Sequence, residues 1–481
     1  MQILVAVLLN GTNNLAIVTA PLQQEHVDVY NYNTDQLQEL DLKHYLHPFT
    51  DYKKLADEGS RIITRAEGIY LWDSDGNRYL DAMAGLWCVN VGYGRPEIAN
   101  AVSEQIRELP FYNSFFKTAN PPAVELSRLV CSLAPAHMNH VFFTGSGSEA
   151  NDTVVRMVRH YWASEGQPNR KVIISRENAY HGSTVAAASL GGMKPMHAQG
   201  GLPIPDIEHI GQPYWYQEGG DLTLEAFGEK IADELEAKIL ALGADKVAAF
   251  IGEPIQGAGG VIIPPSTYWP RIQEICSRYD VLIVADEVIC GFGRTGKWFG
   301  CDYFDIKADL MPIAKGLSSG YLPIGGVLVS DRVAEGLIDK GGEFNHGFTY
   351  SGHPVAAAAA IANLNILLDE GIVERVEKDI GPYAEKKWRS LTEHPLVGEA
   401  RIIGLIGAIE LVKDKDSREF FADRGDVGTI CRDICIENGL VVRAVADTMI
   451  MSPPLCISEG EIDELVELLT RCLDLTAERV L

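Results

Sequence analysis

Short β-branched apolar runs alternate with helical patterns through the middle of this 481-residue chain, and this alternation limits the fold more than any other feature. The runs, from His140 onward, are HVFFTGSG, KVIISREN, AAFIGEP, VLIVADEV and IGGVLVS. Between the first two, Asp152 to Trp162 carries apolar residues at the spacing of a helix face that packs on a sheet. Strands that alternate with helices predict a parallel sheet covered by helices. We therefore expect an α/β protein with a large central domain.

A different pattern follows the central domain. After about Gly347 come an alanine-rich helix, a strand at Leu405 to Leu411 and a final helix from Glu459. Ser458 and Glu461 form a Ser-x-x-Glu capping box, which predicts the start of that helix. We predict an N-terminal part of a small domain over 36–85, a large domain over 86–346 and a C-terminal small domain over 347–481.

The N-terminal segment is predicted to lie outside these domains. The apolar run Ile3 to Leu9 is shorter than the roughly 18 residues of a membrane span. The first Lys or Arg is Lys43, so the positive charge of a signal peptide is missing. We interpret residues 1–35 as an extension, either a disordered segment or a start-site artefact, and expect a cytoplasmic protein.

Charge and cysteine usage narrow the kind of partner. The formal charge of −25 and the pI near 4.9 would repel phosphate backbones and anionic membranes, so we expect neither nucleic acid nor membrane as a partner. A cationic small molecule would be attracted. Nine cysteines are scattered without a Cys-x-x-Cys pair, and only His137 and His140 form a close histidine pair. We therefore expect no metal site and a reducing compartment.

The strongest chemical signal lies where the run VLIVA ends. Asp286 and Glu287 follow it directly, and the carboxyl ends of parallel strands are where ligands bind. Downstream, IAKGL places Lys315 in a short apolar loop, where desolvation favours the neutral, nucleophilic amine. Pyridoxal phosphate needs a lysine, a carboxylate facing its ring nitrogen and a backbone cradle for its phosphate. Residues 145–148, Gly-Ser-Gly-Ser before a helix, are a candidate cradle, although such a turn alone is also typical of a plain loop.

Six ordered motifs connect these residues to a known family: FFTGSGSEAND, ENAYHGST, EPIQGAGG, ADEVICGFGRTG, IAKGLSSGYLP and HGFTYSGHP. From about Phe49 to Leu475 the chain resembles the class III (omega) aminotransferases. It is most similar to their putrescine or polyamine:pyruvate branch through AMAGLWCVNVGYG and VRAVADTMIMSPPL. The resemblance implies a PLP-dependent transferase of fold type I, with a mainly parallel seven-stranded sheet in the large domain and a small α+β domain. It also implies a homodimer or tetramer with shared active sites.

The resemblance assigns roles at the cofactor. Lys315 would form the imine with pyridoxal 5'-phosphate, Asp286 would pair with the ring nitrogen, and Tyr180 and Val288 would enclose the ring. Glu253 would hold an arginine in its resting position, with Gln256 near the phenolic oxygen. The other implied cofactor contacts are Ser146, Gly147, Ser148, His181, Phe348 and Thr349, of which Thr349 would reach the phosphate of a neighbouring subunit.

The resemblance also implies a substrate pocket with apolar walls and one arginine. Arg443 matches a mobile arginine that binds the carboxylate of the keto acid and swings aside for an amine without one. Apolar walls suit an aliphatic diamine. The implied lining is Phe49, Leu86, Trp87, Phe115, Tyr180 and Ala258, with Phe115 reaching the partner's pocket.

These roles lead to a ping-pong transaminase that moves nitrogen from putrescine or a related amine to pyruvate, giving an aminoaldehyde and L-alanine. A β-alanine (omega-amino acid):pyruvate aminotransferase is the alternative within the class, and a PLP-dependent aminomutase or decarboxylase is the alternative outside it. A nicotinamide-binding oxidoreductase is set aside, because no Gly-x-Gly-x-x-Gly turn follows a strand with an acidic residue about 20 positions on. The preferred amine, the use of 2-oxoglutarate and dimer versus tetramer stay open at this stage.

Overall fold

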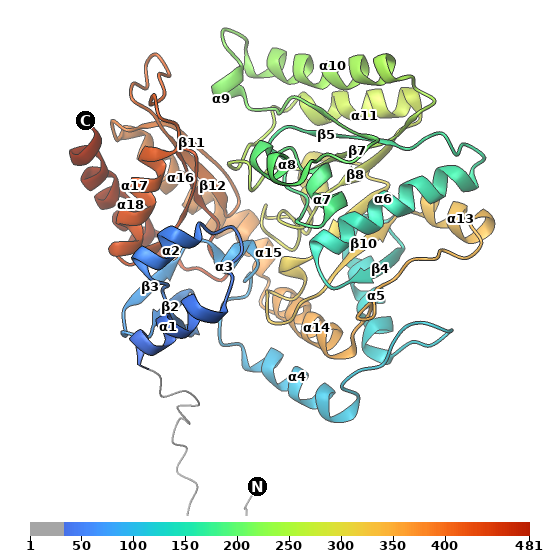
Figure 1. Cartoon of the computed structure of the whole chain (residues 1–481), viewed down its shortest axis with the longest axis horizontal. Coiled ribbons are helices and arrows are strands. Elements are labelled where there is room, and N and C mark those ends of the chain that lie inside the picture. Colours follow the sequence, from blue (N-terminus) through green and yellow to red (C-terminus); the bar gives the residue numbers. More distant parts are fainter. Residues whose placement is uncertain (1–32) are drawn as a thin grey trace, which may run out of the picture. The chain divides into compact units, whose positions relative to one another are not determined.

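The computed structural model describes residues 33–481, which divide into two compact units (Figure 1). The smaller unit holds residues 33–64 and 73–76, and the larger unit holds residues 65–72 and 77–481. The run at Ile3 to Leu9 and nearly all of the predicted extension lie outside the described residues. In the smaller unit, Asn33 and Asp51 cap α1 (Thr34–His44) and α2 (Tyr52–Glu58) by accepting hydrogen bonds from backbone N–H groups.

A seven-stranded sheet forms the centre of the larger unit, in the order β4-β10-β9-β8-β7-β5-β6. Neighbours from β9 to β6 run parallel, whereas β10 is antiparallel to both β4 and β9. The prediction of a mainly parallel sheet is confirmed, but the run IGGVLVS breaks the pattern. Its connection from β9, residues 314–324, contains no crossover helix, and such a short link suits antiparallel strands. The strands are β4 (His140–Thr144), β5 (Val172–Arg176), β6 (Ile207–Ile210), β7 (Val247–Gly252), β8 (Leu282–Ala285), β9 (Leu310–Ile313) and β10 (Gly325–Val329).

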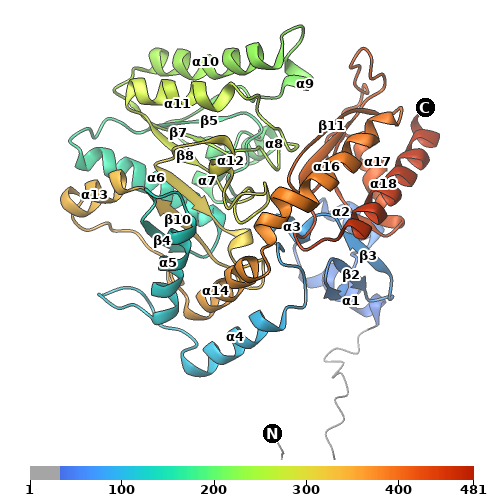
Figure 2. The same cartoon turned by 180° about the vertical axis from the view of Figure 1, so that it is seen from behind.

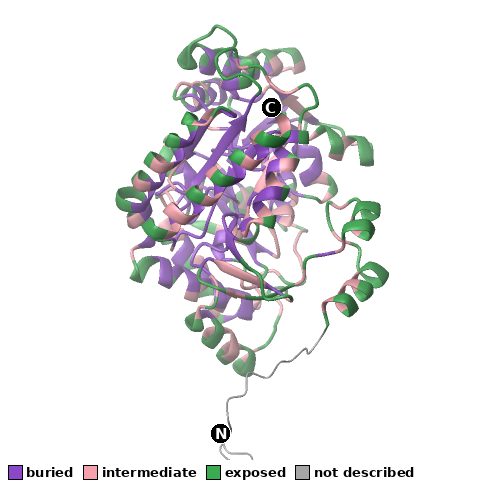
Figure 3. Cartoon of the chain, turned by 90° about the vertical axis from the view of Figure 1, so that its left-hand side faces the viewer, coloured by how far each residue is buried: buried purple, intermediate pink, exposed green. Residues whose placement is uncertain are grey.

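Alternating side chains of these strands build a core on each face of the sheet. In β8, Leu282 and Val284 pack in one apolar cluster and Ile283 and Ala285 in the other. The first cluster includes the apolar face of α6 (Gly147–Ser164), and the second includes α10 (Leu224–Leu242) and α11 (Tyr268–Tyr279). Figure 2, seen from behind, shows α10 and α11 side by side and apart from α6. The strands are buried, while the outward faces of the helices are exposed (Figure 3).

The chain contains two smaller sheets besides the central one. One joins β1 (Ile63–Glu67), β2 (Tyr70–Asp73), β3 (Arg78–Asp81) and β13 (Leu440–Val441), so segments from both ends of the chain meet where Leu440 pairs with Leu80. The other joins β11 (Val397–Ile403), β12 (Ile406–Leu411), β15 (Thr448–Met451) and β14 (Arg443–Val445). The predicted strand at Leu405 to Leu411 is thereby confirmed. The domain division at 36–85, 86–346 and 347–481 stays a prediction.

The final helix, α18 (Glu459–Val480), begins where the sequence predicts. Ser458 Oγ accepts from the backbone N–H of Glu461, and the Glu461 carboxylate accepts from the N–H of Ser458 at 2.8 Å. The remaining elements are α3 (Ala84–Trp87), α4 (Pro96–Glu108), α5 (Pro121–Leu133), α7 (Val185–Leu190), α8 (Lys194–Gly200), α9 (Trp215–Glu218), α12 (Gly300–Phe304), η1 (Lys315–Leu317), α13 (Asp331–Lys340), α14 (Pro354–Asp369), α15 (Ile372–Arg375), η2 (Val376–Ile380), α16 (Gly381–Ser390), η3 (Leu391–Glu393) and α17 (Asp426–Glu437).

Across residues 33–481, every single helix is too short or too polar to cross a membrane. One bent pair, Pro354–Asp369 with Ile372–Glu393, passes the test of length and composition when its two parts are joined.

Candidate active site

The predicted chemical groups converge at the carboxyl edge of the central sheet. Asp286 directly follows β8, Glu253 directly follows β7, and Lys315 comes two residues after β9. Parallel strands bring these ends to one edge. There they line a cavity of about 130 Å³. Its lining is Gly147, Ser148, Asn151, Tyr180, His181, Gly182, Glu253, Asp286, Val288, Ile289, Ala314 and Lys315.

Asp286 is buried, and both of its carboxylate oxygens accept hydrogen bonds. Its side chain is 3% exposed, and Oδ2 accepts from Asn151 Nδ2 at 2.8 Å and from His181 Nδ1 at 2.7 Å. Oδ1 accepts from the backbone N–H of Val288 at 3.1 Å. A carboxylate that accepts several hydrogen bonds is stabilised in its charged form. Asp286 can therefore keep a negative charge facing a cationic ring.

Lys315 occupies a strained position beside this charge. Its φ of 46° lies in the left-handed region, which side chains other than glycine rarely adopt. Burial lowers the pKa of its amine, and the nearby charges of Asp286 and Glu253 oppose that shift. Because a neutral amine is the nucleophile, the burial of Lys315 favours attack on an aldehyde.

The predicted phosphate cradle lies at the start of α6. Ser146 caps the helix, with Oγ accepting from Glu149 N at 3.2 Å, so the first helical residues are Gly147 and Ser148. Backbone N–H groups in the first turn of a helix have no partner inside it and attract anions. A Cβ on Gly147 would lie 3.1 Å from the methyl groups of Val288, so a larger residue would press on the side chain that lines this cavity.

Tyr180 and Glu253 are linked on one side of the cavity. The backbone N–H of Tyr180 donates to Glu253 Oε1 at 3.2 Å, and that of Gly257 donates to Oε2 at 2.9 Å. Burial raises the pKa of Glu253, and the interaction with His181 opposes that shift. Among the described residues no ion pair joins Glu253 to Arg443, so the predicted resting partnership stays a prediction.

Arg443 lies at the start of β14 and is half-buried. Burial lowers the pKa of its guanidinium, while the Tyr180 phenol opposes that change, and the charge of Arg443 in turn lowers the pKa of Lys315. Arg443 is thus within electrostatic range of Tyr180 and Lys315. It therefore belongs to the surroundings of the cavity although it does not line it.

Gln256 and Ala258 lie deeper, in the loop after β7. Gln256 Nε2 donates to Glu177 O at 3.1 Å, and its Oε1 is buried without a hydrogen-bond partner. Ala258 is 5% exposed. The structure does not bring either side chain into the cavity lining, so their contacts with cofactor or substrate stay predictions.

The other predicted pocket residues are dispersed. Trp87 is 2% exposed and Leu86 is 59% exposed, in a segment where Ala84, Gly85 and Trp87 all have positive φ. Phe49 belongs to the smaller unit, which we describe by itself.

Phe115 lies elsewhere, against the loop that carries Phe348 and Thr349. A Cβ added to Gly347 would lie 3.1 Å from its ring. Thr349 is exposed and Phe348 is half-buried, and both are absent from the lining of the cavity at the sheet edge.

Asn151 and Gly182 also line the cavity, although the sequence did not predict them as site residues. Asn151 follows Gly147 by four residues, so helical spacing places both on one face, and that spacing is the signal that could have found it. Gly182 has φ of 133°, and a Cβ there would lie 2.5 Å from Ser148 Oγ. Ile289 and Ala314 complete the group and carry no distinctive signal.

These residues fit pyridoxal phosphate. The buried carboxylate of Asp286 suits the ring nitrogen, the start of α6 suits the phosphate, and Lys315 supplies a desolvated amine in the same cavity. Asn151 Oδ1 is buried without a hydrogen-bond partner, which leaves an acceptor on the cavity wall. Fold and site together define a PLP-dependent enzyme of fold type I.

Comparison with known proteins places the chain in a particular family. The model of the Aminotransferase class-III family matches residues 52–473, and the chain belongs to that family. It is 62% identical over 453 residues to the putrescine–pyruvate aminotransferase of Pseudomonas aeruginosa, covering 94% of this chain and 99% of that protein. It is 42% identical over 440 residues to gamma aminobutyrate transaminase 1 of Solanum lycopersicum, covering 90% and 85%.

A solved structure has the same architecture. The omega transaminase of Pseudomonas jessenii in complex with PMP superposes with a TM-score of 0.90 at 44% identity. The match covers 92% of this chain and 99% of that one. The protein is an aminotransferase that uses pyridoxal phosphate.

Proposed function

We propose that the protein transfers the amino group of an ω-amine, putrescine or a related diamine or polyamine, to pyruvate. The products are an aminoaldehyde and L-alanine. The observation that carries this proposal is the 62% identity to a putrescine–pyruvate aminotransferase over 94% of this chain. The acidic balance of the chain, with a formal charge of −25, favours a cationic donor.

The residues at the sheet edge divide the chemical work. When bound, pyridoxal phosphate supplies a protonated ring that accepts electrons from the substrate Cα as its proton leaves. Lys315 is the base that takes this proton on Nζ and returns it, because burial favours its neutral form. Asp286 keeps the ring nitrogen protonated through a negative charge that Asn151 and His181 hold in place. Tyr180 and Val288 keep the ring plane in position.

Arg443 would allow one site to bind two different substrates in turn. Pyruvate carries a carboxylate, which a planar guanidinium binds with two parallel hydrogen bonds, whereas putrescine carries none. Arg443 is half-buried, so pairing with a carboxylate offsets the cost of its desolvation. We expect it to contact the keto acid and to leave the space to the amine in the other half-reaction.

A panel of amine donors tests the specificity. Putrescine, cadaverine, spermidine, β-alanine and γ-aminobutyrate are each supplied with pyruvate, and alanine is quantified. The same donors are then tested with 2-oxoglutarate as the acceptor. Putrescine or another diamine should give the highest kcat/KM with pyruvate. A preference for β-alanine would identify an omega-amino acid enzyme, and a preference for 2-oxoglutarate would contradict the proposed acceptor.

The role of Lys315 is tested in the same protein. Lys315→Ala should remove the visible absorption band of the purified enzyme, because the covalent link to the cofactor cannot form. Lys340→Ala is the matched control, since Lys340 pairs with Glu165 on the surface. An unchanged band in Lys315→Ala would refute the role of this lysine.

We also propose that the enzyme is a cytoplasmic homodimer or a dimer of dimers. Phe115 and Thr349, both assigned to contacts with a second subunit, come from segments that lie together. Residues of both segments and of β4 line one apolar depression of about 300 Å³. Light scattering coupled to gel filtration should give at least twice the mass of one chain. Phe115→Ala should weaken both assembly and activity, and a fully active monomer would contradict the shared site.

A further inference from the structure

Two buried polar side chains hold the backbone that follows Lys315. They are Ser319, 1% exposed, and Asn363 of α14, which is fully buried. Asn363 Nδ2 donates to the carbonyl oxygen of Gly316 at 2.8 Å and to that of Leu317 at 3.0 Å. An amide has two N–H donors, so both are used on the turn that carries the lysine.

Ser319 ties this turn to the substrate-side segment. Its Oγ donates to Asn363 Oδ1 at 2.5 Å and accepts from the backbone N–H of Asn90 at 3.1 Å and of Val91 at 3.2 Å. A hydroxyl has one donor and two acceptor positions, and all three are used here. The connection therefore runs from the lysine turn, through one hydroxyl, to the chain just after Trp87.

The surrounding packing leaves this arrangement little freedom. Lys315 and Ser319 have φ of 46° and 49°, a left-handed conformation that costs conformational energy in residues other than glycine. A Cβ on Gly316 would lie 2.4 Å from Asn90 Nδ2, and that nitrogen donates to Phe292 O at 2.8 Å. Such strained backbone persists only where its contacts hold it.

We propose that Ser319 and Asn363 are positioning residues for amino transfer, which hold the Lys315 backbone in its left-handed turn and thereby place the amine against Asp286. The proposal rests on the proposed role of Lys315. Without these hydrogen bonds the turn relaxes and the amine moves relative to the reacting carbon. Small displacements of a reacting group lower the rate strongly while substrate binding changes little.

Ser319→Ala and Ser318→Ala provide a matched pair. Ser318 is 2% exposed in the same turn, but its Oγ donates to Leu322 O at 2.6 Å and lies outside the connection. Ser319→Ala should lower kcat about tenfold or more and change the amine KM less than about threefold. It should also shift the pH midpoint of the visible band of the holoenzyme by about half a unit, because the band reports the ionisation of the group that Lys315 forms. Ser318→Ala should leave kcat within about twofold and the midpoint unchanged.

Asn363→Asp gives a second test, since it keeps the shape of the side chain and removes the two N–H donors. It should change kcat and the midpoint in the same direction as Ser319→Ala. If Asn363→Asp does not fold, Ser319→Ala decides alone. A Ser319→Ala enzyme that matches Ser318→Ala in kcat and midpoint would overturn the proposal. Lys315→Ala separates the two claims, because retention of the band there refutes the lysine assignment itself.

Discussion

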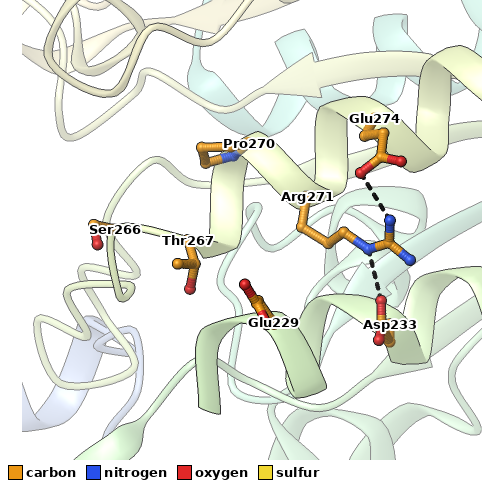
Figure 4. A pocket seen from close by; sticks show the side chains of 7 residues that line it. All are labelled: Glu229, Asp233, Ser266, Thr267, Pro270, Arg271 and Glu274. Carbon is orange, nitrogen blue, oxygen red and sulfur yellow. Dashed lines mark hydrogen bonds and ion pairs between the residues drawn. The ribbon is translucent and has the colours of Figure 1, made fainter. Parts of the chain in front are cut away.

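Two of the cavities in the larger unit differ sharply in the surroundings of their carboxylates. The cavity at the sheet edge holds Asp286 and Glu253, both 3% exposed and both bonded to N–H donors. The cavity between α10 and α11, about 590 Å³, holds Glu229, Asp233 and Glu274 on open helix surfaces (Figure 4).

The partners of these carboxylates differ as well. At α10 and α11 they surround Arg271, whose guanidinium lies 2.7 Å from both Asp233 and Glu274. Asp233 and Glu274 are exposed, and each pairs with this long cationic side chain. At the sheet edge, backbone and neutral or weakly basic side chains supply the hydrogen bonds, and Lys315 is the nearby amine. The larger cavity is thus an ion-paired surface, whereas the smaller one holds the groups that we propose for catalysis.

The largest expected effect is on Asp286. Asp286→Asn keeps the shape but removes the charge that the cofactor ring needs, so kcat/KM should fall about a thousandfold, roughly 4 kcal/mol. Asp233→Asn, the control in the α10–α11 cavity, should stay within about twofold of the unchanged enzyme. Steady-state kinetics with putrescine and pyruvate measure both. If Asp286→Asn kept more than a tenth of the activity, the contrast between the two cavities would be lost.

The second-largest expected effect is a loss of activity that differs between pyruvate and putrescine. Arg443→Ala should lower kcat/KM for pyruvate about 30-fold, roughly 2 kcal/mol, because a bidentate ion pair is lost, and should change that for putrescine less than about threefold. Stopped-flow measurement of each half-reaction gives the two values. Arg443→Lys is the control for charge without the planar fork. Equal losses in both half-reactions would show that Arg443 supports the fold and not the keto acid.

A third prediction concerns Glu287, the fully buried neighbour of Asp286. Its carboxylate accepts from the backbone N–H of Gly300 and Cys301, yet burial raises its pKa from 4.5 to about 7. Between these values the folded state holds a proton that the unfolded state has lost, so stability falls as pH rises from about 5 to 7. Glu287→Gln removes this titration. It should therefore reduce the loss of folding stability between about pH 5 and 7 by about 1 to 2 kcal/mol. Urea unfolding at several pH values tests it, and an identical pH dependence in both proteins would be incompatible with the buried acid.

The smallest effect belongs to Arg271. Its three ion pairs lie at the surface, where each contributes little, so Arg271→Ala should lower the free energy of unfolding by less than about 1 kcal/mol. Activity should not change. Thermal unfolding at low and high salt measures the loss, which salt should reduce. A loss above about 3 kcal/mol would mean that this network stabilises the fold as a buried pair does.

The sequence predicted some features of the site and of the fold but not others. Strand ends such as those before Asp286 and Glu253 were predictable, because apolar runs mark the strands and ligands bind at their carboxyl ends. Lys315 was predictable from its apolar loop and from the family motifs. The antiparallel direction of β10 was not, because a run of apolar residues carries no direction.

Contacts between distant segments could not be predicted. His181 reaches Asp286 across 105 positions, and Asn363 reaches Gly316 across 47. Neither residue type marks a site by itself, and the partners of both side chains are set by the packing of separate elements. The role of Gly182 could not be predicted either, because the need for glycine depends on where Ser148 lies in space.

The most direct test of the account is to locate the cofactor on the chain. Borohydride treatment of the holoenzyme makes the link between lysine and pyridoxal phosphate permanent, and mass spectrometry of the peptides then identifies the modified residue. We expect the added mass on the peptide with Lys315, in the wild-type enzyme and in Asp286→Asn alike. Modification of a different lysine, or none in an active preparation, would contradict the assignment of the site.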